Sequence, residues 1–416
     1  MKNMIKVPFA GRVYDHHEIE LLKQAADEFW LTSGHFVNEF ENGLRKFIDP
    51  KARVMAVNSG STANLIAFMA LTSHSLGERR IKRGDEVITV AVGFPTTISP
   101  IINYGAVPVF VDITIPQYNI DVNYLEEAYN PLKTKAIMIA HTLGNPFDIQ
   151  TIASFCHDKK LWLIEDCADA LGSEYKYNKP DTEHVGTVGD LGTLSFYPAH
   201  MITTGEGGAV FTSKPELGKL VVKFRDWGRS CICPPGYDNT CGQRFTMEWG
   251  NLPYGYDHKY VYDELGYNCK MTEMQGAIGV AQLEKLKDFI QIRRKNWEIL
   301  KYELIDLQDY FYLPESFPGS IPCWFGFMLT IRDSSIDRRE LQRYLEKNGI
   351  QTRLLFAGNI VKQPCFANLR NGIDYKVIGE LSNTDKVMKD GIWVGVYPGL
   401  NKEHMIYIGS KIKEFI

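Results

Sequence analysis

Long apolar runs are missing from this sequence of 416 residues. No stretch reaches the roughly 18 consecutive apolar residues that a membrane-spanning helix requires. The opening segment, MKNMIKVPFAGRVYDHHEIE, also lacks the apolar core of about 7–15 residues that a signal peptide carries. These absences predict a cytoplasmic protein. In that compartment its eight cysteines are not expected to form structural disulfides, and a cluster of thiols would instead favour metal binding.

A strong excess of one charge is missing as well. The formal net charge is −4 at pH 7, which provides no general field for binding nucleic acid or anionic lipid. The 44% hydrophobic and 23% charged residues are typical of a globular protein. We find no internal repeat and no low-complexity linker, and the length predicts more than one domain.

From about residue 50, short apolar runs alternate with segments of helical periodicity. The expected strands lie in RVMAVNSG, DEVITVAVG, VPVFVDI, KAIMIAHTLG and LWLIEDCAD. This alternation predicts an α/β fold with a mostly parallel central sheet that is covered on both faces. Such sheets bind ligands at the carboxyl ends of their strands. The site is therefore expected in the turns after Val57, Val92, Ala140, Ile164 and Ser195.

We expect two domains. Residues 1–285 would form a large cofactor-binding domain that includes the N-terminal segment, and residues 286–416 a smaller C-terminal α+β domain, indicated by CWFGFMLTI, RRELQRYLEKNGI and IWVGVYPGL. Within the large domain, residues 226–268 are irregular and rich in Gly, Pro, Tyr and Asp. A loop of that length inside a compact protein is usually functional.

One absence concerns a single position. The stretch SFYPAHMITTGEGG, followed by AVFTS, has the pattern of a segment on which a vitamin-B6 enzyme carries its cofactor-linking lysine, but the position holds His200. No lysine occurs between Lys179 and Lys214. Histidine cannot link stably to an aldehyde cofactor, but it can accept a proton near neutral pH. The alternative is a histidine with a structural role only.

Four further motif residues follow strand ends in the order that a phosphorylated pyridine needs. Gly60 of NSGSTAN, with the adjacent Ser61, could bind phosphate at a helix N-terminus, although ordinary capping explains the motif equally well. Asp166 of EDCAD could hold a pyridine nitrogen protonated, or begin a helix. Phe94 of GFPTT could stack on the ring, or belong to the core. Ser195 could add a phosphate contact.

Seven segments resemble, in order, the DegT/DnrJ-type nucleotide-sugar aminotransferases, and the resemblance covers most of the chain. These segments are NSGSTANL, GFPTT, HTLGNPFDI, IEDCADALGS, SFYPAHMITTGEGGAVFT, RDWGR and LGYNCKMTEMQGAIGVAQLEKL. The resemblance implies the type I PLP-dependent transferase (aspartate aminotransferase) fold and a homodimer. It also implies roles for individual residues: phosphate binding by Gly60, Ser61 and Ser195, ring stacking by Phe94, a pyridine contact by Asp166, and a contact from Asn268 to the phosphate of the neighbouring subunit.

The histidine narrows the resemblance to the sugar 3-dehydrases, which carry this lysine-to-histidine change. It implies that pyridoxamine 5′-phosphate is held without a covalent bond. His200 would then be the catalytic base whose action leads to loss of the sugar 3-hydroxyl.

The stretch RDWGRSCICPPGYDNTCGQRF places Cys231, Cys233 and Cys241 in a C-x-C-x7-C arrangement. Three thiols so close together in a loop indicate a soft-metal site, and their spacing alone slightly favours zinc. Together with His200, the resemblance implies a [2Fe–2S] cluster. Its fourth ligand is expected upstream, and Cys167 of EDCADALGSEY is the residue assigned to it.

The expected protein is thus an iron–sulfur, pyridoxamine-phosphate-dependent sugar 3-dehydrase. It would act on an NDP-4-keto-6-deoxyhexose, with CDP-4-keto-6-deoxyglucose as the expected substrate, and receive electrons from an iron–sulfur flavin reductase. The product would serve 3,6-dideoxyhexose synthesis for surface lipopolysaccharide (O-antigen). Three alternatives stay open: a cluster-free colitose-type 3-dehydratase, a PLP-dependent sugar aminotransferase, and a non-catalytic protein of the same fold.

Overall fold

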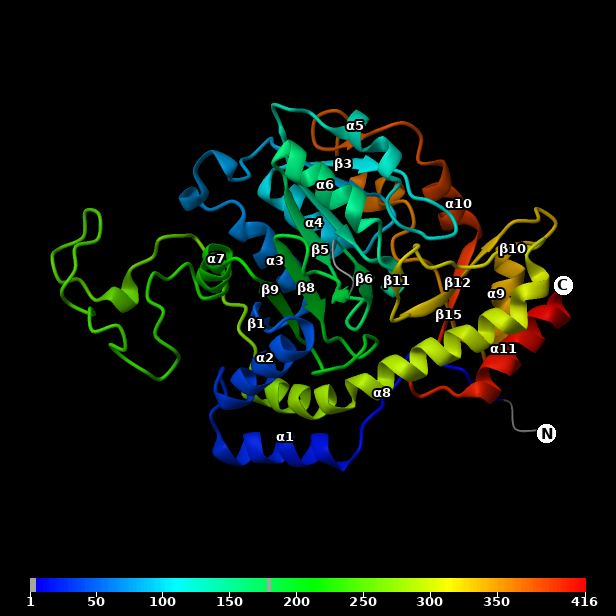
Figure 1. Ribbon diagram of the computed structural model, residues 1–416, viewed down its shortest axis with the longest axis horizontal. Coiled ribbons are helices and arrows are strands. Elements are labelled where there is room, and N and C mark those ends of the chain that lie inside the picture. Colours follow the sequence, from blue (N-terminus) through cyan, green and yellow to red (C-terminus); the bar gives the residue numbers. More distant parts are fainter. Residues whose placement is uncertain (1–4, 178–180) are drawn as a thin grey trace.

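An eight-stranded sheet forms the centre of the protein, of which the computed structural model describes residues 5–177 and 181–416 (Figure 1). In sheet order the strands are β1 (Arg53–Val57), β9 (Gly208–Thr212), β8 (Leu191–Ser195), β5 (Trp162–Asp166), β4 (Thr134–Ala140), β2 (Glu86–Val90), β3 (Val107–Val111) and β14 (Lys376–Val377). Only the pairs that include β9 are antiparallel. The expected mostly parallel sheet is therefore confirmed, and its strand ends meet at one edge.

Helices cover both faces of this sheet. They are α2 (His35–Ile48), α3 (Gly60–Ala70), α4 (Pro95–Tyr104), α5 (Leu125–Ala128), α6 (Ile149–Lys159), α7 (Pro215–Arg225) and α8 (Glu273–Leu304). Helix α1 (His16–Glu28) packs against α8 on the side away from the sheet (Figure 1). Alternate side chains of β4 enter two separate cores. Ile137 and Ile139 pack into one core, whereas Ala136 and Met138 pack into the other. Burial on both faces explains why these strands have near-continuous apolar sequences.

A second sheet lies toward the C-terminal end of α8 (Figure 1). It contains β10 (Phe311–Tyr312), β12 (Gly326–Ile331), β15 (Gly391–Gly395) and β13 (Thr352–Arg353), with helices α9 (Arg338–Lys347), α10 (Ser382–Asp390) and α11 (Lys402–Phe415). A third, small sheet consists of β11 (Ser320–Ile321), β6 (Glu174–Lys176) and β7 (Thr182–His184). The continuous helix α8 passes through residue 285, and the domain division there stays a prediction.

Short 3-10 helices complete the secondary structure of the described residues. They are η1 (His74–Arg79), η2 (Val122–Tyr124), η3 (Thr142–Gly144), η4 (His258–Tyr260), η5 (Ile305–Leu307), η6 (Ile360–Lys362) and η7 (Pro364–Phe366).

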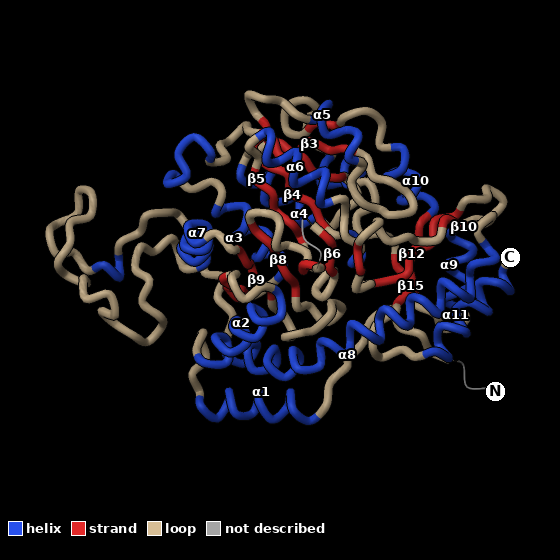
Figure 2. The backbone as a smooth tube through the Cα atoms, in the orientation of Figure 1, coloured by secondary structure: helices blue, strands red, loops and turns tan. Residues whose placement is uncertain are grey.

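The segment of residues 226–268, which we call the cysteine loop, projects from the body of the molecule after α7 (Figures 1 and 2). Backbone bridges join its two ends, between Asp226 and Asn268 and between Arg229 and Tyr262. Apart from η4 the loop contains no helix or strand among the described residues, as its composition predicted. It is nevertheless tied at its base, so its position relative to α7 is defined.

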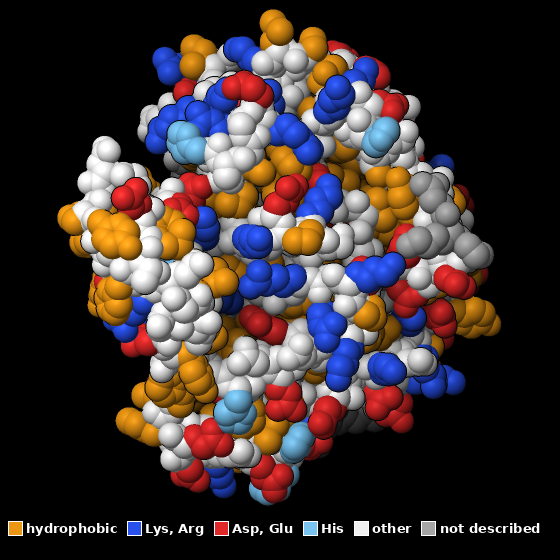
Figure 3. Space-filling view, turned by 60° about the vertical axis from the view of Figure 1, so that its left-hand side comes forward, with side chains coloured by type: hydrophobic (Ala, Val, Ile, Leu, Met, Phe, Trp, Pro, Cys, Tyr) orange, Lys and Arg blue, Asp and Glu red, His pale blue; other side chains and the backbone are white. Residues whose placement is uncertain are grey.

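The surface on the side of this loop carries charges of both signs. Figure 3 shows Lys and Arg side chains interspersed with Asp and Glu over this face. This mixture agrees with the small net charge of −4. Among the described helices, none has the combined length and apolar character needed to cross a membrane.

Candidate functional site

Asp166 ends β5 at the edge of the sheet where the site was expected. Its side chain is only 4% exposed. Oδ2 accepts hydrogen bonds from Asn64 Nδ2 and Thr97 Oγ1, both at 2.7 Å, and Oδ1 accepts one from the backbone N–H of Ala168 at 3.0 Å. These donors offset the cost of burying a carboxylate. Asp166 is thus a fixed, buried acceptor, which suits a protonated ring nitrogen.

Gly60 and Ser195 lie against each other at the N-terminus of α3. A Cβ added to Gly60 would lie 2.4 Å from Ser195 Cβ, so only glycine permits this approach. Ser59 caps the helix and accepts a hydrogen bond from Thr62 N at 3.1 Å. The first N–H groups of the helix, on Gly60 and Ser61, are those that attract an anion at such an end. The capping and phosphate-binding interpretations of this motif are therefore compatible.

Phe94 occupies the N-cap position of α4 and is 53% exposed. Its ring meets Phe356 edge-on, with centroids 6.1 Å apart and an interplanar angle of 88°. The exposure argues against a core residue and leaves ring surface for stacking. Asn268 is also exposed, and its Oδ1 accepts a hydrogen bond from Lys270 Nζ at 2.6 Å. Its contact with a neighbouring subunit stays a prediction.

His200 lies in the turn that follows β8, with a side chain that is 15% exposed. Its Nδ1 is 3.3 Å from Asp169 Oδ1, although the two groups lack the alignment of a hydrogen bond. The ring also packs against Phe325 at a centroid distance of 5.3 Å. A carboxylate beside Nδ1 favours the proton on that nitrogen and leaves Nε2 as the basic atom. Asp169 had no role in the sequence-based site.

Arg293 of α8 fixes the backbone around His200. Its Nη2 donates hydrogen bonds to the carbonyl oxygens of His200, at 2.9 Å, and Ala199, at 3.4 Å. Burial lowers the pKa of Arg293 to about 10. The helix that joins the two large sheets therefore also holds the turn that carries the candidate base.

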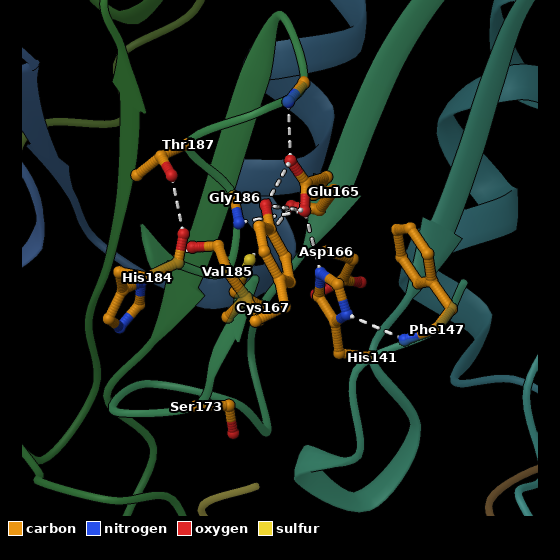
Figure 4. Close-up of polar contacts among 12 residues, drawn as sticks. His141, Phe147, Glu165, Asp166, Cys167, Ser173, His184, Val185, Gly186 and Thr187 are labelled. Carbon is orange, nitrogen blue, oxygen red and sulfur yellow. Dashed lines mark hydrogen bonds and ion pairs between the residues drawn. The ribbon is translucent and has the colours of Figure 1, made fainter. Parts of the chain in front are cut away.

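Behind Asp166, a buried network surrounds Glu165 (Figure 4). Its Oε2 accepts hydrogen bonds from His141 Nε2 at 2.9 Å, Gly186 N at 2.9 Å and Tyr175 OH at 3.1 Å. Burial by itself would raise the pKa of Glu165, but the hydrogen bond and charge of His141, with backbone donors, hold that pKa below its ordinary value. The network anchors the end of β5 and so the backbone of Asp166.

Cys167, expected as a cluster ligand, is completely buried in the main core. Its thiol donates to the carbonyl oxygen of Glu165 at 3.5 Å, and burial raises its pKa well above the ordinary value. A Cβ added to Gly186 would lie 2.8 Å from its sulfur. Cys167 does not line the cavity that the loop cysteines share, so the structure does not bring it together with them.

Cys231, Cys233 and Cys241 line one small cavity in the cysteine loop. Thr240 Oγ1 donates a hydrogen bond to Cys233 Sγ at 3.1 Å, which lowers the pKa of Cys233 to about 7. Cys241 Sγ lies 3.8 Å from His258 Nδ1. Over residues 5–177 and 181–416, no three His, Cys, Asp or Glu side chains stand close enough together to enclose a metal ion in their present positions. The loop thiols share a cavity, and the cluster stays a prediction.

The other four cysteines lie apart from the cavity of the loop thiols. Cys156, Cys269 and Cys323 are buried, and Cys365 is exposed.

Comparison with known proteins agrees with the resemblance. Residues 13–413 match the DegT/DnrJ/EryC1/StrS aminotransferase family. The lipopolysaccharide biosynthesis protein RfbH of Salmonella typhimurium is 52% identical over 98% of this chain and 91% of the relative. The dTDP-4-dehydro-2,6-dideoxy-D-glucose 3-dehydratase of Saccharopolyspora spinosa is 45% identical over 98% of this chain and 86% of the relative.

A solved structure shares the complete fold. It is the Escherichia coli GDP-4-keto-6-deoxy-D-mannose-3-dehydratase with bound hydrated PLP, which is 30% identical, with a TM-score of 0.84. The likeness covers 98% of this chain and all (100%) of that chain. The expected aspartate aminotransferase fold is confirmed.

Proposed function

This chain belongs to the DegT/DnrJ/EryC1/StrS aminotransferase family, and we propose that within it the chain acts as a nucleotide-sugar C3-dehydrase. The observation that carries the proposal is His200, which stands beside Asp169 in the turn where a cofactor-linking lysine was expected. A proton acceptor takes the place of a covalent anchor there. This favours elimination over a complete transamination cycle.

The residues at the sheet edge fit pyridoxamine 5′-phosphate. Asp166 would face the ring nitrogen, Gly60 and Ser195 would receive the phosphate, and Phe94 would cover the ring. The close approach of Gly60 to Ser195, with no room for a Cβ, supports this assignment. When bound, the cofactor would supply an electron sink that acidifies a neighbouring C–H and allows the 3-hydroxyl to leave.

The protein groups would divide the proton transfer between them. Asp169, 3.3 Å from Nδ1, would favour the proton on that nitrogen, so that Nε2 would be the atom that accepts a proton. Arg293 fixes the backbone of His200 through its carbonyl oxygen. The base is thereby held in one orientation without a covalent bond to the cofactor.

The names of the relatives support the substrate class. One relative is a 3-dehydratase of a dTDP-sugar, one is a lipopolysaccharide biosynthesis protein, and the similar structure acts on a GDP-sugar. We assign an NDP-4-keto-6-deoxyhexose to this chain, with CDP-4-keto-6-deoxyglucose as the substrate. The product would enter 3,6-dideoxyhexose synthesis for lipopolysaccharide.

The cysteine loop extends the proposal to a reductive reaction. Exchange of the 3-hydroxyl for hydrogen consumes two electrons and two protons and releases water, so an external reductant is needed. Cys231, Cys233 and Cys241 would hold a [2Fe–2S] cluster, which would supply one-electron transfer from a flavin-containing reductase. Their shared cavity lies on a projecting loop that a protein donor can reach. We further propose a homodimer, with Asn268 facing the phosphate of the second subunit.

The test uses anaerobically purified protein with pyridoxamine 5′-phosphate and CDP-4-keto-6-deoxyglucose in deuterated water. We expect label exchange and loss of the 3-hydroxyl, both detected by NMR, and both lost in His200→Asn. The same assay with dTDP- and GDP-linked sugars shows which nucleotide the protein prefers on its substrate. If the unmodified protein instead converted the substrate into a stable amino sugar and left the 3-hydroxyl in place, it would be an aminotransferase.

A further inference from the structure

His258 shares the cavity of the three loop thiols, and it is a histidine that the spacing of the cysteines did not point to. It is only 7% exposed. Its Nδ1 lies 3.8 Å from Cys241 Sγ. The remaining residues that line the cavity are Asn239, Arg244 and Lys259. Arg244 and Lys259 do not ligate metal as charged groups. Both are paired with carboxylates, Arg244 with Asp257 at 2.8 Å and Lys259 with Asp238.

The backbone of the loop places His258 between the two segments that carry the cysteines. His258 N donates to the carbonyl oxygen of Arg244 at 2.9 Å, which ties it to the segment after Cys241. Ser230 N donates to the carbonyl oxygen of Val261 at 2.8 Å, which ties the residue before Cys231 to the same turn. These two hydrogen bonds bring His258 close to both segments of the loop that carry cysteines.

The ring of His258 is held by its neighbours, with Nδ1 on the side of Cys241. Nε2 lies 3.4 Å from Ser230 Oγ, and one face of the ring stacks on Trp249 with a centroid distance of 4.5 Å and an interplanar angle of 20°. Ligating histidines commonly use the second ring nitrogen for such an outer hydrogen bond, which fixes the ring and its tautomer. Nδ1 is then the nitrogen that faces the thiols.

We propose that His258 is the fourth ligand of the metal centre held by Cys231, Cys233 and Cys241, in place of Cys167. The proposal rests on the metal-binding part of the function proposed above. A set of three thiolates and one imidazole suits the [2Fe–2S] cluster assigned here, since histidine replaces cysteine on iron in some such clusters, and it suits zinc equally.

Binding requires the four side chains to move closer to one another.

The experiment measures iron, sulfide and zinc in the full chain, purified anaerobically and reconstituted with iron and sulfide. Three variants are compared with the unmodified protein. His258→Phe retains a ring to stack on Trp249 but removes the nitrogen ligand, His258→Cys supplies a thiolate instead, and Cys167→Ala is the matched control. Circular dichroism establishes that each variant is folded. Pulsed electron paramagnetic resonance of the reduced centre detects a directly bonded nitrogen.

We expect His258→Phe to lose bound metal to background and Cys167→Ala to retain it. His258→Cys should retain the centre but lose the strong nitrogen coupling seen in the unmodified protein. A zinc centre lost in His258→Phe would support the ligand assignment while refuting the cluster. If an iron–sulfur centre is present, shows no nitrogen coupling and is retained in His258→Phe, then His258 is not a ligand, although the cluster assignment is supported. Protein that binds neither metal would overturn both.

Discussion

Replacing His200 with lysine restores an amine to the turn after β8, where the neighbouring residues already fit a B6 cofactor. We expect His200→Lys to link pyridoxal phosphate covalently, with a visible absorbance band and a mass increase after borohydride reduction. C3-deoxygenation should fall about tenfold or more, since the proposed base has been replaced. His200→Asn controls for loss of the base without gain of an amine. Full deoxygenation activity in the lysine variant would mean that His200 is not the base.

Asp166→Asn tests the acceptor at the end of β5. The amide cannot stabilise a protonated ring nitrogen as the carboxylate does, so the affinity for pyridoxamine 5′-phosphate and the turnover should decrease together. Equilibrium dialysis of the cofactor and steady-state rates measure the two effects. Thr97→Val is a useful companion, because it removes one donor to Asp166 Oδ2 and leaves the charge. An unchanged rate with tightly held cofactor in Asp166→Asn would exclude Asp166 from the site.

For single residues, the sequence indicated candidates within motifs but not the side chains that contact them. Asp166, Gly60 and His200 were selected as candidates because each follows a strand in a recognisable pattern. Asn64 and Thr97 were missed although their motifs had been noted, because their side chains meet Asp166 from two different helices. The proximity of Asp169 to His200 likewise depends on the turn after β8, which no local pattern describes.

The hairpin of β6 and β7 carries a buried histidine that should make stability depend on pH. His184 Nδ1 donates to the carbonyl oxygen of Val185 at 2.6 Å, and Nε2 accepts from Gly172 N at 2.8 Å. If Nε2 were protonated, its N–H would point at the N–H of Gly172, and two donors cannot form a hydrogen bond with each other. Burial lowers the pKa of His184 to about 4, despite the opposing effects of Val185 and Glu174. The neutral ring is therefore the folded form.

Because the unfolded chain binds this proton more readily, stability should decline as the pH falls from about 6.5 to about 4. The contribution from His184 is about 3 kcal/mol. Urea unfolding at several pH values measures it. His184→Gln should be less stable at neutral pH but show a shallower decline, even though Glu165, with its lowered pKa, acts in the same direction. His157→Gln, at an exposed position of α6, is the control. Equal slopes for His184→Gln and the unmodified protein would contradict the assignment.

Helices and strands could be predicted from the sequence where burial leaves a clear pattern of apolar residues. β1 to β5 were predicted, because burial on both faces gives these strands near-continuous apolar sequences. The hairpin of β6 and β7 was not predicted, because its strands contain three residues each and show no usable alternation. The two-residue β14 was missed for the same reason, since its place beside β3 comes from tertiary contacts.

For the molecule as a whole, the candidate cofactor site and the cysteine loop are built from separate parts of the structure. Asp166, Ser195 and His200 belong to the sheet edge and the turn beside it, whereas the loop thiols lie beyond α7 (Figure 1). The sequence placed both sets on one chain but could not show this separation, because it depends on how residues 226–268 leave the body. Damage to one site should therefore leave the other intact.

Single replacements of Cys231, Cys233 or Cys241 by alanine test this separation. Each should lose the cluster, since the remaining loop thiols cannot satisfy four iron ligand positions. Proton abstraction and loss of the 3-hydroxyl, detected as exchange of label from water, should need only the sheet-edge residues and continue at close to the original rate. Reductase-dependent C3-deoxygenation should fall to background, because electrons no longer reach the substrate. Cys365→Ala, at an exposed position, should preserve both reactions. A loop variant that keeps its iron and completes the reduction would refute the cluster, whereas simultaneous loss of label exchange would show that the loop also shapes the cofactor site.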